Sequence, residues 1–518
     1  MKNLILLGMI AFAFSSCSKN NSIEAELRAG SKSKPAKVSS ITNYYVDDTS
    51  GNDANDGLSP ATALKTIQAA LWKTTDGVGA TIYVAGGTYH ERLWWPNSGA
   101  SNSEPITLTS YNGGTVILDG INATNSTQNA MISIESKSYI RIDDIHITNN
   151  IRNYASGIAM TGSGTDVHFT QCEISNINWT SNPSATPTSN DNASPLIVVG
   201  QTATSYSEIY IGYNEIYDCN TGYSEGLTLT GNVVNFLLEN NTVHDISNIG
   251  IDMSGHYSWT GAPSNVNYAR NGNCRGNIVY NCVSPIATSG GIYVDGGKWI
   301  NIEGNTCYAN YAGINVGCEN DNNTAEGINV RSNFIYNNIE AGILFGANQP
   351  NSSVINSMVS NNTLFNNYSA GGWGGEIHLQ NMDNVSFINN IVHSRSNIVV
   401  IALAGYASTN LTFDYNNYYS TSGTPSNIIF DWGGNGGPTY LTFASFISGT
   451  GLDANSTYGS PGFVSGSLPT PDLHLASSSA CINSGLPSFV AQPGEFDVDH
   501  STRVVNSRVD IGADESPY

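Results

Sequence analysis

A repeat of about 28 residues is the feature that most constrains what this chain can fold into. Eight segments align on an Asn, and the intervals between the aligned Asn residues are 27, 36, 28, 28, 29, 28 and 27. The aligned residues are Asn214, Asn241, Asn277, Asn305, Asn333, Asn362, Asn390 and Asn417. Such regular steps predict a stacked repeat architecture, in which each unit buries its apolar face against the next.

Most intervals also contain a short strand of the form Gly-Ile-x-Val-x, as at residues 250–254, 291–295 and 313–317. Alternation places Ile and Val inside and the x residues outside. Two or three strands per repeat with no helix between them predict an all-β parallel β-helix over residues 43–518. Asn suits the repeated turn because it tolerates the left-handed conformation and its amide can bond to the Asn one coil away.

The open N-terminal end of such a solenoid needs a cover, because exposed strand edges invite aggregation. Residues 59–73 have the pattern of an amphipathic helix. The pattern consists of Ser59 as N-cap, Pro60 at the first helical position, and Leu64, Ile67 and Leu71 on one face. We therefore predict an N-terminal capping helix, and a closing segment at the C-terminal end.

Two repeats carry extra residues, at 176–195 and 256–273. Insertions in solenoid repeats become loops on one face and often form the walls of a binding site.

Charge limits the partners of the chain. Asp and Glu number 41 against 19 Lys and Arg, which gives a net charge of −22. Such a surface repels nucleic acid and anionic lipid, so we expect neither as a partner and expect a monomer.

The first residues predict export. Lys2 precedes an apolar run over residues 4–14 that is too short to span a bilayer. Small residues then precede Cys17, a pattern that resembles a bacterial lipobox. We predict a lipoprotein signal peptide over residues 1–16, a lipidated Cys17 with a flexible tether over residues 17–42, and anchoring to the outer membrane through the lipid alone.

Seven Cys residues follow Cys17, and none has metal-ligand spacing with His. Several fall at repeat positions, which favours burial in the apolar stack over a disulfide framework. Cys274–Cys282 and Cys307–Cys318 are the pairs that the sequence leaves open as bridges.

Both ends of the chain resemble right-handed β-helix proteins of the pectate-lyase-like superfamily. The matching segments are residues 45–46, 50–57, 59–62, 65–67, 82–84 and 86–89, and, near the C-terminus, 472–475, 480–485 and 510–515. The resemblance spans residues 43–517 and implies a right-handed coil. It implies little about activity, because this superfamily contains lyases, glycosidases, epimerases and non-catalytic proteins.

Alignment of the Gly-Ile-x-Val-x strands allows the outward-facing columns to be read. One column contains Thr228, Asp252, Tyr293, Asn315 and Leu344; the next contains Thr230, Ser254, Asp295, Gly317 and Gly346; a third contains His256, Gly297 and Glu319. Three carboxylates thus lie on neighbouring coils: Asp252, Asp295 and Glu319. With coils about 4.8 Å apart and about 3.3 Å per residue, the Cα atoms of Asp295 and Glu319 should lie about 8 Å apart.

Side chains close that gap to the range of about 5–9 Å used by paired carboxyls in glycoside hydrolysis. We therefore predict an exported glycoside hydrolase of a poly- or oligosaccharide, with Asp295 as nucleophile, Glu319 as acid and Asp252 beside them. The pair also resembles that of β-helical glycosidases, including the β-xylosidase family. Predicted substrate contacts are His256, Tyr257, Trp259, Tyr293, Asn315 and Lys298, since aromatic rings stack on sugars.

Two other functions stay open. In a Ca²⁺-dependent polysaccharide lyase, Asp252, Asp295 and Glu319 would hold the ion and Lys298 would be the base. In a non-catalytic glycan-binding lipoprotein, these carboxylates would do no chemistry. No phosphate-binding or dinucleotide-binding motif occurs, so we expect no cofactor other than the lyase's Ca²⁺.

Overall fold

The computed structural model describes residues 41–402 and 408–518. The predicted signal peptide, Cys17 and nearly all of the tether therefore lie outside the described residues.

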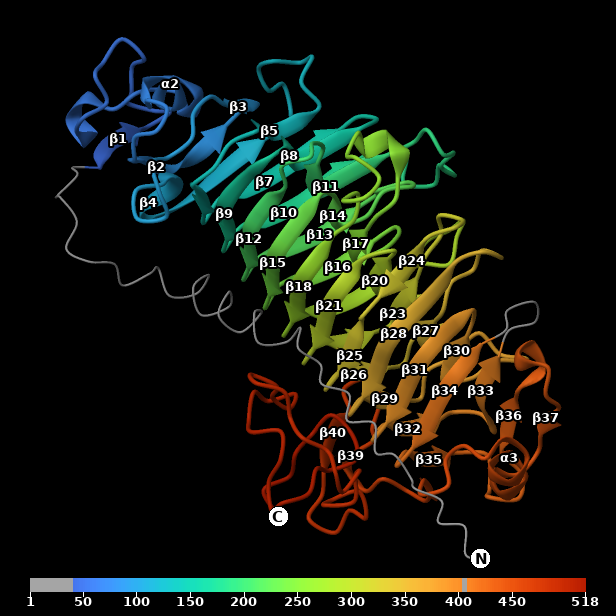
Figure 1. The fold of residues 1–518 in the computed structure, drawn as a ribbon. Coiled ribbons are helices and arrows are strands. Elements are labelled where there is room, and N and C mark those ends of the chain that lie inside the picture. The colour runs from blue at the N-terminus through green and yellow to red at the C-terminus, as the bar shows by residue number, and fades with distance from the viewer. Residues whose placement is uncertain (1–40, 403–407) are drawn as a thin grey trace, which may run out of the picture.

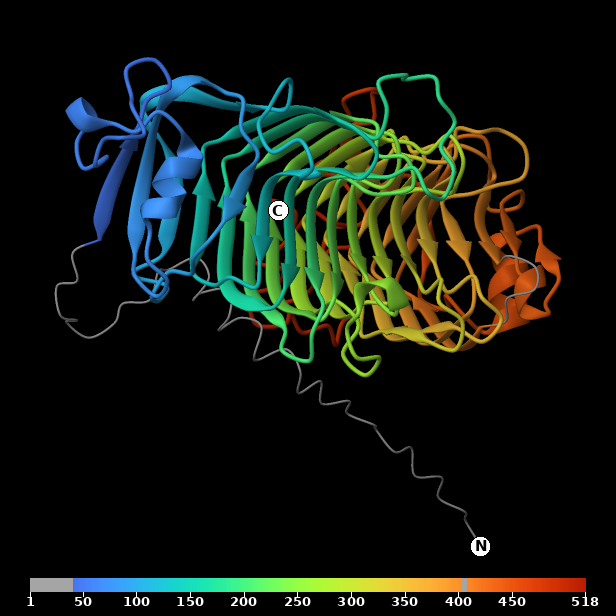
Figure 2. The same cartoon turned by 90° about the horizontal axis from the view of Figure 1, so that it is seen from above.

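The chain forms the predicted right-handed parallel β-helix. Its coils stack from the N-terminal end to the C-terminal end in chain order, as Figures 1 and 2 show from two sides. One sheet has 25 strands, a second has 13, and two further strands form a small separate sheet. Neighbouring strands of the two large sheets pair in parallel, apart from the antiparallel pair at the end of the second.

The strands of the 25-stranded sheet are β1 (Thr42–Val46), β2 (Ala80–Tyr89), β4 (Ile106–Asp119), β6 (Ile140–Asp143), β7 (His146–Ile151), β9 (Gly164–Thr170), β10 (Glu173–Asn178), β12 (Tyr206–Gly212), β13 (Glu215–Cys219), β15 (Val233–Glu239), β16 (Thr242–Ile246), β18 (Arg270–Arg275), β19 (Ile278–Cys282), β21 (Lys298–Glu303), β22 (Thr306–Tyr308), β24 (Thr324–Glu326), β25 (Asn329–Arg331), β26 (Phe334–Tyr336), β28 (Ser353–Ser360), β29 (Thr363–Phe365), β31 (Met382–Ile388), β32 (Ile391–Ser394), β34 (Thr409–Asp414), β35 (Asn417–Ser420) and β38 (Thr457–Tyr458).

The 13-stranded sheet carries the outward columns. Its strands are β3 (Leu93–Trp95), β5 (Ala130–Glu135), β8 (Ala155–Gly162), β11 (Ala193–Gly200), β14 (Leu227–Gly231), β17 (Ile251–Ser254), β20 (Gly290–Asp295), β23 (Ala312–Gly317), β27 (Ala341–Phe345), β30 (Ile377–Leu379), β33 (Ile398–Ala402), β36 (Ile429–Asp431) and β37 (Thr439–Tyr440).

A buried ladder of Asn side chains joins the coils. The Nδ2 of Asn277 donates to Oδ1 of Asn305 at 3.0 Å, and the Nδ2 of Asn305 donates to Oδ1 of Asn333 at 3.0 Å. Seven such bonds connect eight residues: Asn214, Asn241, Asn277, Asn305, Asn333, Asn362, Asn390 and Asn416. The predicted coil-to-coil amide bond is confirmed. The last member is Asn416 and not Asn417, because Asn417 pairs in register with Ile391.

The left-handed residue of the repeated turn is the one before each ladder Asn. The φ values of Gly276, Gly304 and Ser332 are 61°, 62° and 55°, respectively. The Asn residues that follow them are not left-handed. The prediction that the ladder Asn itself takes this conformation is therefore wrong. The Asn is fixed by its side-chain bonds, and its neighbour makes the bend.

The N-terminal cap is a short helix and not one continuous helix over residues 59–73. Pro60–Thr62 form the 3-10 turn η1, and the α-helix α2 covers Ile67–Lys73 with Thr66 as its N-cap. The two are separated because Leu64 forms a parallel bridge with Val46. The three apolar residues of the pattern, Leu64, Ile67 and Leu71, are all fully buried as expected.

The C-terminal end is closed by α3 (Phe443–Thr450), whose buried Phe446 stacks on Phe430 at 4.2 Å between ring centroids. The 3-10 turn η3 (Gly433–Asn435) precedes it. The residues after α3 fold back along the side of the coils with β39 (Phe463–Ser465) and β40 (Asp472–Leu475), as Figure 1 shows.

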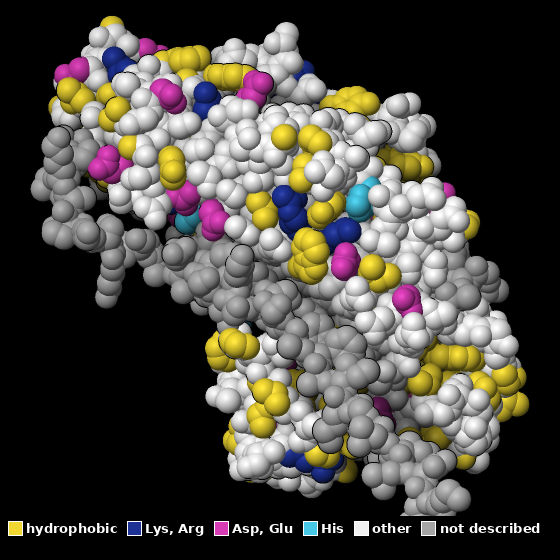
Figure 3. All heavy atoms as spheres, in the orientation of Figure 1, with side chains coloured by type: hydrophobic (Ala, Val, Ile, Leu, Met, Phe, Trp, Pro, Cys, Tyr) yellow, Lys and Arg dark blue, Asp and Glu magenta, His cyan; other side chains and the backbone are white. Residues whose placement is uncertain are grey.

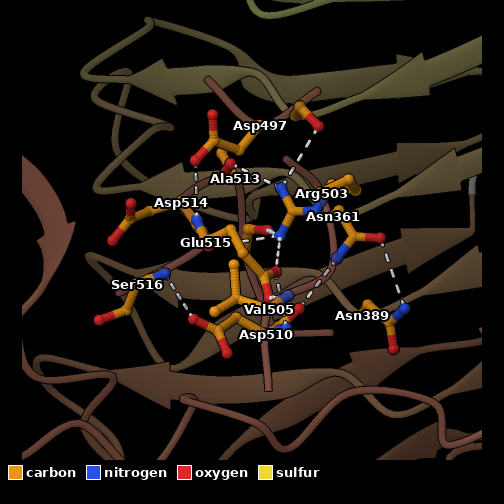
Figure 4. Close-up of polar contacts among 12 residues, drawn as sticks. Asn361, Asn389, Asp497, Arg503, Val505, Asp510, Ala513, Asp514, Glu515 and Ser516 are labelled. Atoms are coloured by element: carbon orange, nitrogen blue, oxygen red, sulfur yellow. Dashed lines mark hydrogen bonds and ion pairs between the residues drawn. The ribbon is translucent and has the colours of Figure 1, made fainter. Parts of the chain in front are cut away.

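Arg503 holds this folded-back segment together (Figure 4). Its guanidinium is fully buried, pairs with Glu515 at 3.0 Å and donates to the carbonyl of Ala513 at 2.7 Å. Asn361 of the coil wall then donates to the carbonyl of Asp510 at 2.9 Å. A buried charge is tolerated here because it is paired and hydrogen-bonded.

All seven Cys residues in the described part of the chain are buried free thiols. The prediction of burial in the apolar stack is confirmed, and neither Cys274–Cys282 nor Cys307–Cys318 is a disulfide.

Charged side chains are sparse on the face drawn in Figure 3, where neutral polar groups and backbone predominate. Across the described residues, no helix has the length and apolarity needed to cross a bilayer.

A second Asn ladder ends on a buried acid. Asn338 donates to Asn367 at 2.7 Å, and Asn367 donates to Oε2 of Glu376 at 2.6 Å. Glu376 is fully buried, and this burial raises its pKa to about 8. The Glu376 carboxyl therefore accepts from Asn367 in the same way that the Asn367 amide oxygen accepts from Asn338.

We expect Glu376→Gln to stabilise the protein at alkaline pH. The folded pKa of Glu376 lies above its ordinary value of 4.5, so the folded state keeps a proton that the unfolded chain loses. Stability should therefore fall as pH rises from about 4.5 to about 8, and the variant should lack that component. At about 1.4 kcal/mol per pKa unit, the gain above pH 8 is on the order of a few kcal/mol. Thermal unfolding across this range measures it.

Asp383→Asn is the matched control, since hydrogen bonds from Thr409 and Asn410 lower the pKa of this half-buried acid. The same pH dependence in wild type and Glu376→Gln would contradict the assignment.

Candidate active site

A cavity of about 820 Å³ lies on the outward face of the 13-stranded sheet. Its floor comes from strands β11, β14, β17 and β20, and its walls come from the loops at both ends of these strands. The lining residues used below are Tyr154, Tyr223, Glu225, Thr228, Asp252, Ser254, Tyr257, Trp259, Tyr293, Asp295 and Glu319. Both predicted insertions contribute, since Ser189 and Asn192 belong to the first and Tyr257 and Trp259 to the second.

The strand register places the floor residues as the sequence predicts. Thr228 pairs with Asp252, Asp252 with Tyr293, Tyr293 with Asn315 and Asn315 with Leu344. Ser254 pairs with Asp295 in the next column. Alternation along strands buried on their inner side therefore aims Asp252, Tyr293 and Asp295 into the cavity.

Asp295 and Glu319 are joined by two contacts. The backbone N–H of Glu319 donates to Oδ1 of Asp295 at 2.7 Å. The hydroxyl of Tyr257 lies 2.5 Å from Oδ2 of Asp295 and 3.4 Å from Oε2 of Glu319. Because one hydroxyl reaches both, these two carboxyl oxygens are at most about 5.9 Å apart.

The two carboxyls differ in their surroundings. Asp295 is only 2% exposed, whereas Glu319 is exposed at the mouth of the cavity. Tyr293 donates a second hydroxyl to Oε1 of Glu319 at 3.2 Å. Glu319 thus lies within reach of two phenol hydroxyls, those of Tyr257 and Tyr293.

Burial raises the pKa of Asp295 to about 7, and repulsion from Glu319 adds to the rise, while the Tyr257 hydrogen bond opposes it. Burial also raises the pKa of Asp252 well above its ordinary value, with further contributions from Glu225 and Asp295. The cavity therefore contains buried carboxyl groups whose pKa values are raised from their ordinary range, which is typical of acid–base sites.

Glu225 is a fourth carboxyl in this cavity, and the sequence analysis missed it. Thr228, one of the floor residues, donates its hydroxyl to Oε2 of Glu225 at 3.0 Å. Desolvation raises the pKa of Glu225 to about 7. Glu225 lies two residues before β14, outside the alternating pattern, so strand periodicity carries no signal for it.

The remaining predicted contacts divide into two groups. Trp259 lines the cavity beside Tyr257, and Asn315 lies next to Tyr293 in the same column. His256 instead contacts the carbonyl of Thr324 at 3.4 Å and packs on Tyr268. Lys298 forms an ion pair with Glu326 at 3.4 Å and lies over the Tyr268 ring. His256, Lys298 and Asn315 are therefore not among the residues that line the cavity, whereas Tyr257, Trp259 and Tyr293 are.

The three carboxylates assigned to Ca²⁺ in the lyase alternative are not gathered as a ligand set. Among the described residues, the cluster of His, Cys, Asp and Glu whose ligand atoms all lie within 4.8 Å is His474, Asp499 and Asp514 in the C-terminal segment. In the described part of the chain, no Lys, Arg or His lines the cavity either.

Comparisons with known proteins find one curated relative and several solved structures of low similarity. No protein-family model matches the chain. An uncharacterized protein of Bacillus subtilis (strain 168), YwoF, is 28% identical over 435 residues, which is 81% of this chain and 88% of YwoF.

Several solved structures share the architecture at low similarity. Pectate lyase Pel9A covers 92% of this chain, and 97% of its own length is matched, at 14% identity and a TM-score of 0.49. The lacto-N-biosidase of family GH136 from Eubacterium ramulus covers 73% of this chain, with 64% of its own length matched, at 13% identity and a TM-score of 0.48. XylC in complex with xylose covers 75% of this chain, with 88% of its own length matched, at 12% identity and a TM-score of 0.47. The chemistry of this chain must therefore be argued from its own residues.

We expect Tyr257→Phe to raise the pKa of Asp295 above about 7, because the lost hydroxyl stabilises the carboxylate. The measurement is a ¹³C NMR titration of Asp carboxyl carbons, with the Asp295 signal assigned by its loss in Asp295→Asn. Tyr293→Phe is the control, since its hydroxyl donates to Glu319 and not to Asp295. Equal shifts in both variants would show that the Tyr257 bond is not the cause.

Proposed function

We propose that this protein is a glycoside hydrolase of a poly- or oligosaccharide that acts outside the cytoplasm, anchored through Cys17. The observation that carries the proposal is the juxtaposition of a buried and an exposed carboxyl, Asp295 and Glu319, bridged by one phenol in a large cavity. Sugar cleavage needs one carboxylic acid and one carboxylate on either side of the scissile bond.

Burial reverses the roles that sequence alone favoured. A general acid must hold a proton at working pH, and Asp295 has a pKa raised to about 7 by its burial. The attacking group must be accessible, and Glu319 is exposed at the mouth of the cavity and accepts a hydrogen bond from the Tyr293 hydroxyl. Asp295 is thus the acid in our proposal, and Glu319 is the nucleophile.

The spacing supports cleavage with retention of configuration. Retaining enzymes hold their carboxyls about 5–5.5 Å apart, whereas inverting enzymes leave about 6.5–9.5 Å for a water molecule. The near oxygens of Asp295 and Glu319 are at most about 5.9 Å apart, which is closer to the retaining spacing. Glu319 attacks the anomeric carbon as the glycosidic C–O bond breaks, and the Asp295 proton goes to the leaving oxygen. Water then cleaves the glycosyl–Glu319 ester and returns a proton to Asp295.

The surroundings of Lys298 weigh against β-elimination. Its ammonium is engaged by Glu326 and Tyr268 outside the cavity, so it is not placed to take a proton from a bound sugar. In the residues that the structure describes, the cavity lining also contributes no cation that would neutralise a uronate.

A panel of glycans should therefore give reducing sugar without a rise in ultraviolet absorbance. We expect Asp295→Asn and Glu319→Gln each to lower kcat by at least about 100-fold, because each removes a group acting in the transition state. Lys298→Ala and the addition of a chelator should leave the rate unchanged.

An unsaturated product together with loss of activity in Lys298→Ala would establish the lyase instead. Binding without any product across the panel would favour the non-catalytic alternative.

The pH profile separates the two role assignments. With Asp295 as the acid, kcat/KM should fall above pH of about 7, where this carboxyl loses its proton. Tyr257→Phe should move that alkaline limb to higher pH, because it raises the same pKa. A limb near pH 7 on the acid side, where activity is lost as pH falls, would instead identify Asp295 as the nucleophile. Mass spectrometry after trapping with a 2-fluoro glycoside checks the assignment, since the label should lie on Glu319.

A further inference from the structure

We propose that the cavity binds a sugar with a free ammonium group, such as a glucosamine unit, and that Asp252 and Glu225 hold this cation. The inference rests on the proposed function in one respect, that the ligand of this cavity is a carbohydrate.

The first argument is charge. Glu225, Asp252, Asp295 and Glu319 all line one cavity. Within the described part of the chain, none of the lining residues is Lys, Arg or His. A neutral sugar leaves the mutual repulsion of these acids in place, and a uronate adds to it. An ammonium group offsets it, because an opposite charge nearby favours the ionised carboxylates.

The second argument is an unsatisfied atom at the floor. Oδ1 of Asp252 has no hydrogen-bond partner, although Asp252 is only 5% exposed. Buried polar atoms are generally paired, so an orphaned oxygen on a residue that lines the cavity calls for a donor from the ligand. This observation is independent of the number of acids.

The third argument is that two of the four carboxyls are not needed for hydrolysis. Asp252 and Glu225 lie on neighbouring coils, since Asp252 pairs in register with Thr228, and Thr228 holds Glu225 through its hydroxyl. Coils are about 4.8 Å apart, so one ammonium group can donate to a carboxyl on each.

Aromatic side chains at the mouth fit the same ligand. Tyr154, Tyr223 and Trp259 line the cavity and are 52%, 43% and 61% exposed. Such rings stack on the apolar face of a sugar, and their faces also attract cations. The phenols of Tyr257 and Tyr293 are already bonded to Asp295 and Glu319, so they leave the second pair of carboxyls to the ligand.

The test is a ligand-observed NMR titration with glucosamine, N-acetylglucosamine and glucuronate at about pH 7, where the amine still carries its proton and Glu225, whose pKa is raised to about 7, is partly ionised. These monosaccharides have no glycosidic bond, so binding is measured without turnover. We expect glucosamine to bind at least about tenfold more tightly than N-acetylglucosamine, a difference of about 1.4 kcal/mol, and glucuronate to bind least. Glu225→Gln and Asp252→Asn should each reduce the preference, and Asp383→Asn, which removes an equal charge outside the cavity, should retain it.

Equal or weaker binding of glucosamine would overturn the inference, as would displacement of glucosamine by Ca²⁺ at equimolar amounts, which would identify a metal site. The amino-sugar preference without hydrolysis of any glycan would support the ammonium site while refuting the proposed reaction.

Discussion

The coil-to-coil hydrogen bond of a buried Asn amide is the interaction on which the rest of the molecule depends. Each amide in the ladder donates to a backbone carbonyl and to the next amide, as Asn305 does to Cys274 and Asn333, except that the last, Asn416, donates to the carboxyl of Asp453. An isolated buried amide would be costly, but a stack of them satisfies every member along its length. The ladder aligns the same turn of successive coils along the helix axis, so the strands that follow this turn begin in register.

The strand register brings the cavity residues of successive repeats onto one face. A shift by one residue in any strand would turn its outward side chains into the core. Because Thr228, Asp252 and Tyr293 pair directly, their side chains project from the same face on successive coils. The loops form the walls of the cavity. Because the loops differ in length from coil to coil, only one part of the sheet face is enclosed.

This division explains which features could be predicted. The fold, the outward columns and the nearness of Asp295 to Glu319 follow from alternation and from counted intervals, both of which are local properties of the sequence. Glu225 could not be found in this way, because it enters the cavity from a turn. The surroundings of His256 and Lys298 depend on how the second insertion folds, and periodicity says nothing about that. The hydrogen bond that Asp295 accepts comes from Tyr257 in the same insertion, so it depends on the same loop.

The folded-back C-terminal segment has a consequence for the order in which the protein is completed. Arg503 donates to Ser332, 171 residues away, Asn361 bonds to a carbonyl 149 residues further along the chain, and Leu486 bonds to Asn389 across 97 residues. A chain made from its N-terminus therefore finishes its coils before the covering for their side wall exists. Until the last residues are made, that stretch of wall keeps its polar groups open to water. The side wall is thus completed only when the C-terminal segment is present, although each coil pairs mainly with the coils next to it.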